Sequence, residues 1–145
     1  MTVPPTTFRT DVVTGIKAAL DGVVAAHPTL LLRAYRARPE GFPDLPCAWI
    51  ENRPETARHD SQIRTRIMSP SVVVVRKITN NDEAMAAFDT LVDILADAFT
   101  AMPQFATGTI WDTYTIADED APFGDYDFAA VRFTFNNVTI MEGRV

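Results

Sequence analysis

The sequence has few of the residues that cross-links, zinc sites and phosphate-binding loops require. Its 145 residues include one cysteine, Cys47, two histidines and six glycines. A single cysteine excludes a disulfide within the chain, and one cysteine with two histidines falls short of the four ligands of a structural zinc site. The chain contains no G-x-x-x-x-G-K-[ST], G-x-G-x-x-G or G-x-S-x-G pattern, so it lacks the common signatures of nucleotide-binding and serine-hydrolase enzymes.

Long apolar runs are also missing. The longest purely aliphatic run is Val72–Val75, whereas a membrane-spanning helix needs roughly 20 residues. The N-terminus has no basic residue ahead of an apolar stretch, as a signal peptide would have. We therefore expect a soluble protein with no membrane span, made and used in a cytoplasm.

Basic residues are absent from a long stretch of the chain. The net charge is −6 and the isoelectric point is near 4.8, which argues against a general nucleic-acid binder because phosphate contacts need lysine and arginine. Residues 33–77 hold nine bases against five acids, whereas residues 78–131 hold eleven acids and no base. Two interpretations stay open. The charges either form a solvated surface that confers solubility, or a basic face on one copy meets an acidic face on the next.

Two segments have the apolar spacing of amphipathic helices. The first runs from Phe8 to His27, where the following Pro28 disfavours further helix. The second follows turn and cap residues at 80–82 and extends to about Ala101. Their apolar stripes are Phe8, Val12, Ile16, Ala19, Leu20, Val23 and Val24 in the first helix and Ala84, Phe88, Leu91, Val92, Leu95 and Phe99 in the second.

Strands are predicted on both sides of the second helix, at residues 30–38, 47–51, 71–78, 107–116 and 128–141. The polar, arginine-rich stretch 52–68 predicts a protruding hairpin arm or loop, and residues 1–7 predict a flexible N-terminus. The order of helix, three strands, helix and two strands predicts a single α+β domain over residues 1–145. In this fold a mostly antiparallel sheet carries both helices packed on one face.

Few residues are candidates for chemistry. Cys47 lies in a strand-like context, where a small core residue is the usual role. His27 lies at a helix end and His59 in the polar arm, and neither has a partner at motif spacing. The acidic stretch 118–127 departs from the EF-hand pattern, because its acids do not alternate and a proline interrupts them. We therefore expect no catalytic, cofactor-binding or metal-binding residues and no enzymatic activity.

The candidates for an interface are charged. Asp89, Asp93 and Asp97 are four residues apart, so they form one acidic stripe on the second helix, which has no base to pair with them. The stripe is either a tolerated open surface, a contact for a basic partner, or the wall of a passage from which DNA is repelled. On the basic side, the candidate interface residues are Arg53, Arg58, Arg64, Arg66 and Arg76.

The order of elements carries a resemblance. After the first helix and strand 30–38, a proline-rich turn leads into Leu45-Pro46-Cys47-Ala48-Trp49-Ile50, a leucine-proline pair followed by two small residues and then hydrophobic ones. A polar arm, a valine-rich strand, a second helix and closing strands follow. From Phe8 to Met141 this layout resembles the tail terminator (tail completion) proteins of long-tailed bacteriophages and of related prophage or gene-transfer particles.

The resemblance implies a structural virion protein without catalytic residues or cofactors. Such proteins form a hexameric ring on the head-proximal end of the tail tube, which ends tube growth and provides the surface on which the head connector, or stopper, docks. The implied partners are further copies of the chain, the tail tube protein and the head-connector protein, with DNA only in passage. The implied location is the virion tail, assembled in the bacterial host cytoplasm.

Three other classes of protein stay open. One is a head-closure or other neck protein of the same particle. Another is a small-molecule-binding or enzymatic α+β domain that acts as a dimer, although the chain offers no convergent set of catalytic residues. The last is a nucleic-acid module, which the acidic balance of the chain disfavours.

Overall fold

The computed structural model describes residues 7–40, 45–51, 54–60, 63–77, 81–102, 109–111, 113–119 and 128–143. Arg53 and the acidic residues at 120–127 lie outside this set, as do residues 1–6 of the expected flexible N-terminus. The element order is helix, five strands, helix and four strands, with more and shorter strands than the five predicted.

Both predicted helices are confirmed. Helix α1 spans Phe8–Ala26 and helix α2 spans Asn81–Thr100, each within one residue of the expected bounds. Helix α1 ends at Ala26 with His27 as its C-cap, ahead of Pro28 as predicted, and the His27 N–H donates to the Val23 carbonyl at 2.8 Å. Neither helix is long and apolar enough to cross a membrane.

The main sheet has five strands. Strand β5 (Ser71–Lys77) lies at its centre, and every neighbouring pair is antiparallel except β1 and β2. In spatial order the strands are β1 (Arg33–Tyr35), β2 (Cys47–Glu51), β5, β8 (Phe128–Asn136) and β7 (Thr113–Glu119).

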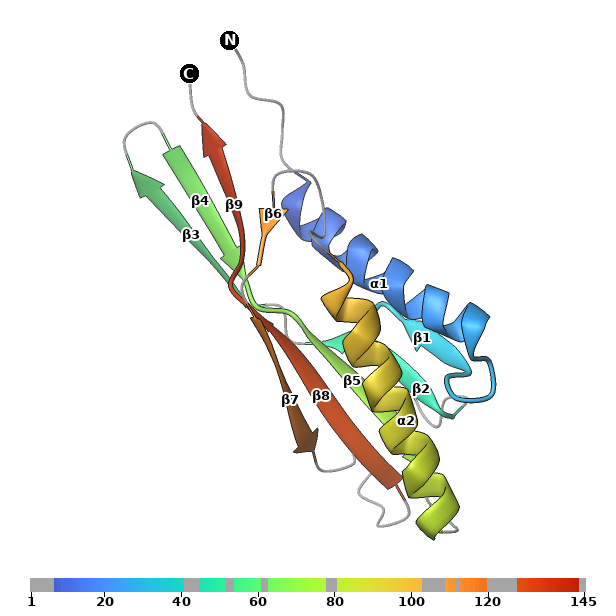
Figure 1. The fold of residues 1–145 in the computed structure, drawn as a ribbon. Coiled ribbons are helices and arrows are strands. Elements are labelled where there is room, and N and C mark those ends of the chain that lie inside the picture. The colour runs from blue at the N-terminus through green and yellow to red at the C-terminus, as the bar shows by residue number, and fades with distance from the viewer. Residues whose placement is uncertain are drawn as a thin grey trace.

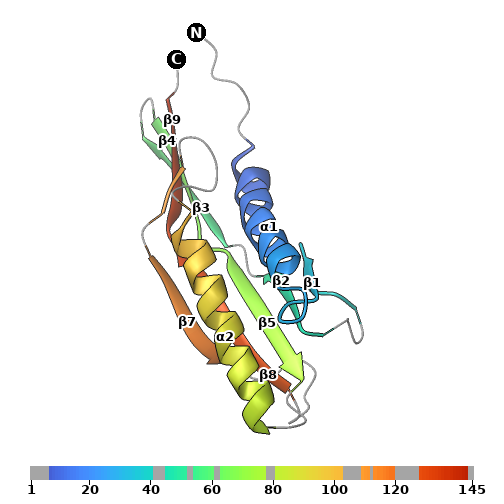
Figure 2. The ribbon, with the colours of Figure 1, turned by 45° about the vertical axis from the view of Figure 1, so that its right-hand side comes forward.

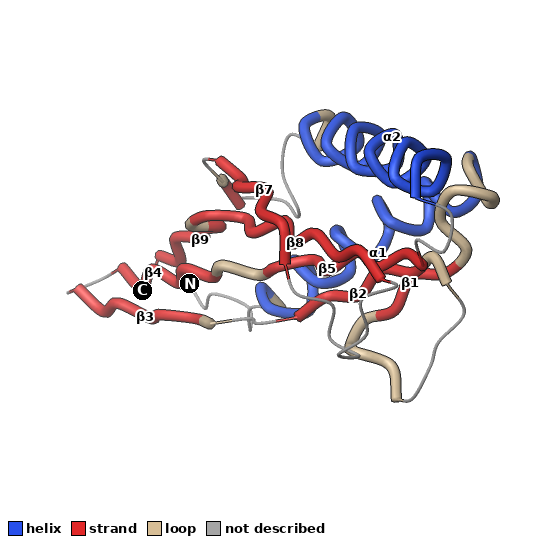
Figure 3. The backbone as a smooth tube through the Cα atoms, turned by 90° about the horizontal axis from the view of Figure 1, so that it is seen from below, coloured by secondary structure: helices blue, strands red, loops and turns tan. Residues whose placement is uncertain are grey.

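The polar stretch 52–68, predicted as either a hairpin arm or a loop, contains a hairpin. Strands β3 (Glu55–Asp60) and β4 (Ile63–Met68) pair antiparallel, and β4 also pairs with β9 (Val138–Gly143). The short β6 (Thr109–Ile110) completes a four-stranded sheet in the order β3-β4-β9-β6. We call this sheet the arm, because it projects beyond α2 as an extension of β5 and β8 (Figures 1 and 3).

Three predicted strands differ from the observed ones. Only Arg33–Tyr35 of the expected strand 30–38 is a strand. The expected strand 107–116 is replaced by β6 and β7, which belong to different sheets. The expected strand 128–141 is interrupted at Asn137, whose φ of 58° places it in the left-handed region that asparagine tolerates. At Asn137 the chain passes from the main sheet into the arm.

Both helices cover the same face of the main sheet (Figures 1 and 2). Alternate strand residues on this face are buried against the two helices and form one continuous core. Burial of each such side chain contributes roughly 1.5–3 kcal/mol. The predicted α+β class, with a mostly antiparallel sheet and two helices on one face, is confirmed. The principal core residues are Phe8, Val12, Ile16, Leu20, Leu91, Leu95, Phe99, Val72, Val74, Phe133 and Phe135.

The opposite face of the main sheet has its own apolar cluster. Cys47 and Trp49 of β2 lie there with Val73 and Val75 of β5, all at most 1% exposed. Cys47 is therefore a buried core residue in the structure, and it has no disulfide partner among the described residues.

Candidate functional site

The acidic stripe predicted on the second helix lies on open surface. Asp89, Asp93 and Asp97 are all exposed, on the side of α2 opposite its buried Leu91 and Leu95. Within the described part of the chain, none of the three carboxylates has an ion-pair or hydrogen-bond partner. Like charges four residues apart cost a few tenths of a kcal/mol per pair, and the last turn of α2 holds no base. The stripe therefore destabilises its own helix slightly.

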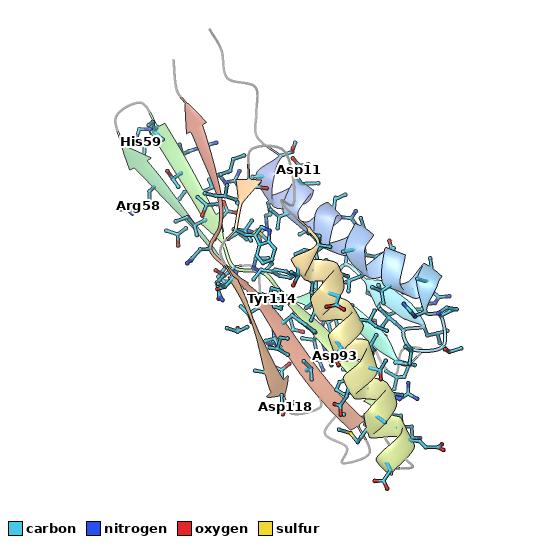
Figure 4. The ribbon with its side chains drawn as sticks, viewed as in Figure 1. Asp11, Arg58, His59, Asp93, Tyr114 and Asp118 are labelled. Carbon is cyan, nitrogen blue, oxygen red and sulfur yellow. The ribbon has the colours of Figure 1, made fainter. Side chains whose placement is uncertain are left out.

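Arg58 is the exposed cation of the arm (Figure 4). It lies on β3 opposite Thr65 of β4, and no residue of the described ranges forms an ion pair or hydrogen bond with it. Arg64 is half-buried at the register position opposite Glu142 of β9. Of these two arginines, Arg58 is the one whose charge is open to a partner.

Arg66 is used within the chain. Its Nε donates to Oε2 of Glu55 at 2.6 Å, and its guanidinium lies 5.3 Å from the centre of the Phe8 ring. Arg9 of α1 donates to the other oxygen of Glu55 at 3.3 Å. The hydrogen bond from Arg66 is the main reason why the pKa of Glu55 lies below its ordinary value of 4.5. This cluster ties the base of the arm to the start of α1.

The remaining candidate arginines are differently placed. Arg76 shares the helix-covered face of β5 with Val72 and Val74, and its buried Nε has no hydrogen-bond partner among the described atoms. Arg53 is outside the described residues. The structure does not gather the predicted interface residues into one patch. The arm arginines lie at one end of the molecule, and the acidic stripe runs along α2 beside the main sheet (Figures 1 and 4).

A charged network on the face away from the helices was missed by the sequence prediction. Arg132 of β8 donates to Glu51 of β2 at 2.9 Å, to Glu119 of β7 at 2.8 Å and to the Ser71 hydroxyl of β5 at 2.7 Å. Trp49 donates its indole N–H to the second oxygen of Glu51 at 2.6 Å. One signal was available, because Arg132 is the lone charge in the otherwise apolar and hydroxylated stretch 128–135.

The network shifts the pKa values of its members. Burial raises the pKa of Glu51, but hydrogen bonds from Arg132 and Trp49 outweigh burial, and the pKa lies below the ordinary value of 4.5. Burial lowers the pKa of Arg132, but its hydrogen bonds to Glu51 and Glu119 outweigh burial. The pKa of Arg132 therefore lies above its ordinary value. Glu51 and Arg132 are therefore charged at neutral pH, and the network is suited to holding strands together.

A shallow hollow lies on the arm. It has a volume of about 420 Å³, and its described lining residues are Arg58, His59, Thr65 and Ile67. All four lie on the single hairpin β3–β4, and they offer a guanidinium and an imidazole to an anionic group. Among the described residues, no group of three histidine, cysteine or acidic side chains could hold a metal ion.

No protein-family model matches this chain, and no curated protein matches it either. A solved structure titled "Virion of native gene transfer agent (GTA) particle" contains a chain with a similar fold. The two chains superpose with a TM-score of 0.61 at 11% sequence identity, and the match covers 93% of this chain and 98% of that chain. This protein therefore has the fold of a component of a gene transfer agent virion over nearly its full length.

Proposed function

We propose that this chain is a structural protein of a phage-like particle, and that it caps the head-proximal end of the tail tube as a ring. The ring would end tube polymerisation and form the docking surface for the head connector. The observation that carries the proposal is the end-to-end likeness of fold to a virion chain, with almost no part of either chain left over. The role is structural, without catalysis, and the location is the virion.

The distribution of charge supports assembly from identical copies. Asp89, Asp93 and Asp97 are exposed on α2 and Arg58 is exposed on the arm, and none of the four has an ion-pair partner among the described residues. Because the opposite charges lie on different parts of one molecule, they can attract neighbouring copies. Contacts between two different patches close into a ring when the rotation allows. The acidic stripe also suits a ring through which DNA passes without binding, because it repels phosphate.

The first test is the mass and shape of the purified protein. Light scattering on a sizing column, at low and high salt, should show a species near six times 16.1 kDa, and negative-stain images of the peak should show a central hole. A ring held by charge should weaken as salt rises. A compact dimer with no larger species would contradict the proposal and favour a small-molecule-binding domain, for which the hollow beside Arg58 and His59 is the candidate site.

A second test separates a tail terminator from a head-closure or other neck protein. The protein is added to growing tail tubes of the particle that carries it, and tube length is measured by electron microscopy. A terminator should bind one end of each tube, and growth should stop there. A head-closure protein should instead bind isolated heads and leave tube growth unchanged.

A further inference from the structure

The two sheets each end in an open strand. Among the described strands, β7 is an outer strand of the main sheet and pairs only with β8, and β3 is an outer strand of the arm and pairs only with β4. The other two outer strands, β1 and β6, are three and two residues long. An unpaired outer strand presents a row of backbone N–H and C=O groups that can accept another strand.

Apart from the acids Asp118 and Glu119 at its end, strand β7 lacks the features that normally protect such an edge. Its seven residues pair with β8 in continuous register without a bulge, and they include no proline, lysine or arginine. Five of the seven are exposed, among them Ile116 at 46%. In the described part of the chain, no backbone group forms a hydrogen bond to its outer edge. Asp118 on β7 is exposed, and its carboxylate has no ion-pair partner among the described residues (Figure 4).

Strand β3 is similar in length to β7 and, unlike β7, carries an arginine. It has six residues against the seven of β7, and Thr56, Ala57, Arg58 and His59 are all exposed. Arg58 is a cation of β3 that has no ion-pair partner in the described part of the chain. Seen from below, β3 and β7 lie on opposite sides of the strands β8 and β9 that join the two sheets (Figure 3). The molecule therefore carries two different open edges that face apart.

We propose that β3 of one copy adds to β7 of the next copy, so that an intermolecular β-ladder holds neighbouring subunits together. The inference rests on the proposed self-assembly and names the contact that produces it. Main-chain hydrogen bonds between the two strands supply the attraction, as in other cases of strand addition. Attraction between Arg58 of β3 and the acidic end of β7 favours the pairing of β3 with β7 over the pairing of two identical strands. Pairing of two β7 strands would instead bring two Asp118 carboxylates together without a cation, and they would repel each other.

Thiol trapping tests the pairing directly. Two variants, Ala57→Cys on β3 and Ala117→Cys on β7, change exposed residues without a side-chain hydrogen bond, and the native Cys47 is buried and shielded from reagent. With Arg58 beside Asp118, position 57 faces 117 in a parallel ladder and 119 in an antiparallel one, so the two cysteines are within reach in both directions. When the two variants are mixed with a short bifunctional maleimide, we expect mostly mixed 57–117 dimers. A mixture of Ala25→Cys, exposed on α1, with Ala117→Cys is the matched control. Dimers of like variants only, or mixed dimers no more abundant than in the control, would overturn the β-ladder.

A charge exchange tests the specificity of the same contact. Arg58→Asp alone and Asp118→Arg alone should each weaken association roughly tenfold, and the double variant should recover most of the loss, because unlike charges then face each other again. Lys77→Asp and Glu40→Arg make the same charge changes at exposed positions outside both edges and should leave association unchanged. Equal losses for single and double variants would contradict the pairing.

The two proposals fail in different ways. If rings form and stop tube growth but no 57–117 dimers are trapped, the β-ladder is wrong and the proposed function stands. If the dimers are trapped but tail tubes grow unchecked in the presence of the protein, the β-ladder stands and the capping role is wrong.

Discussion

Arg132 reaches across a neighbouring strand to Glu51, with 2.9 Å between Nη2 and Oε1. The two residues are 81 positions apart in sequence, and β5 lies between their strands. The same guanidinium also binds Ser71 of β5 and Glu119 of β7. One side chain thus links four of the five strands of the main sheet and favours this strand order over others.

Removing the guanidinium should destabilise the fold. Arg132→Met leaves two partly buried carboxylates without their charged donor, and we expect the free energy of unfolding to fall by about 2–3 kcal/mol, since hydrogen bonds to charged groups contribute about 1.5–3 kcal/mol each. Urea unfolding measures the change. Lys77→Met, which removes an exposed cation, should change stability by less than about 0.5 kcal/mol. A loss for Arg132→Met no larger than this control would contradict the role of the network.

The lowered pKa values of Glu51 and Glu55 predict loss of stability in acid. Both carboxyls have a lower pKa when folded than the ordinary value of 4.5, so the unfolded chain takes up protons first as the pH falls. Their contribution is complete above about pH 4.5 and is lost as the pH falls through the folded pKa values. Urea unfolding across this range should show a shallower acid dependence for Glu51→Gln with Glu55→Gln than for the native chain. An unchanged slope would show that other carboxyls dominate.

The helices and β5 were predictable because their signals are local. The spacing of Phe8, Val12 and Ile16 depends on one helix face, and the four consecutive valines of β5 need no distant partner to indicate a buried strand. The break at Asn137 also left a signal. The β8 residues in the core under the helices are odd-numbered, as in Phe133 and Phe135, whereas Val138 after the break is even-numbered.

The charged network and the positions of the open edges depend on long-range register. Nothing near Arg132 in sequence indicates that Glu51 lies across from it, because that contact exists only after β2, β5 and β8 have paired. The roles of the arm arginines divide for the same reason. Arg66 and Arg58 look alike in sequence, yet only Arg66 faces Glu55 and Phe8.

This division between Arg66 and Arg58 predicts two different phenotypes. Arg66→Met should lower the free energy of unfolding by about 1–2 kcal/mol, because a mostly buried ion pair and a contact over Phe8 are lost. Faster hydrogen exchange at β3 and β4 amides should accompany the loss. Arg58→Met should leave stability and exchange unchanged and weaken only association between copies. If both variants lose stability equally, Arg58 has a structural role that its exposure does not indicate.

Neutralising the acidic stripe should stabilise the fold and weaken assembly. Asp89→Asn, Asp93→Asn and Asp97→Asn together remove two like-charge pairs and an acid near the C-terminal end of α2. We expect the free energy of unfolding to rise by roughly 0.5–1 kcal/mol. If the stripe contacts a basic partner, association between copies should weaken and depend less on salt. Urea unfolding and light scattering measure the two effects.

A matched control lies on the same helix. Asp82 and Glu83 occupy the first turn of α2, where acids interact favourably with the helix dipole. Asp82→Asn with Glu83→Gln should therefore lower stability by roughly 0.5–1 kcal/mol. If the free energy of unfolding rises for the stripe variant and falls for the first-turn variant, the position of the acids along the helix, and not their total charge, determines the cost of the stripe. A triple variant that is more stable and still assembles with unchanged salt dependence would show that the stripe is open surface without a partner.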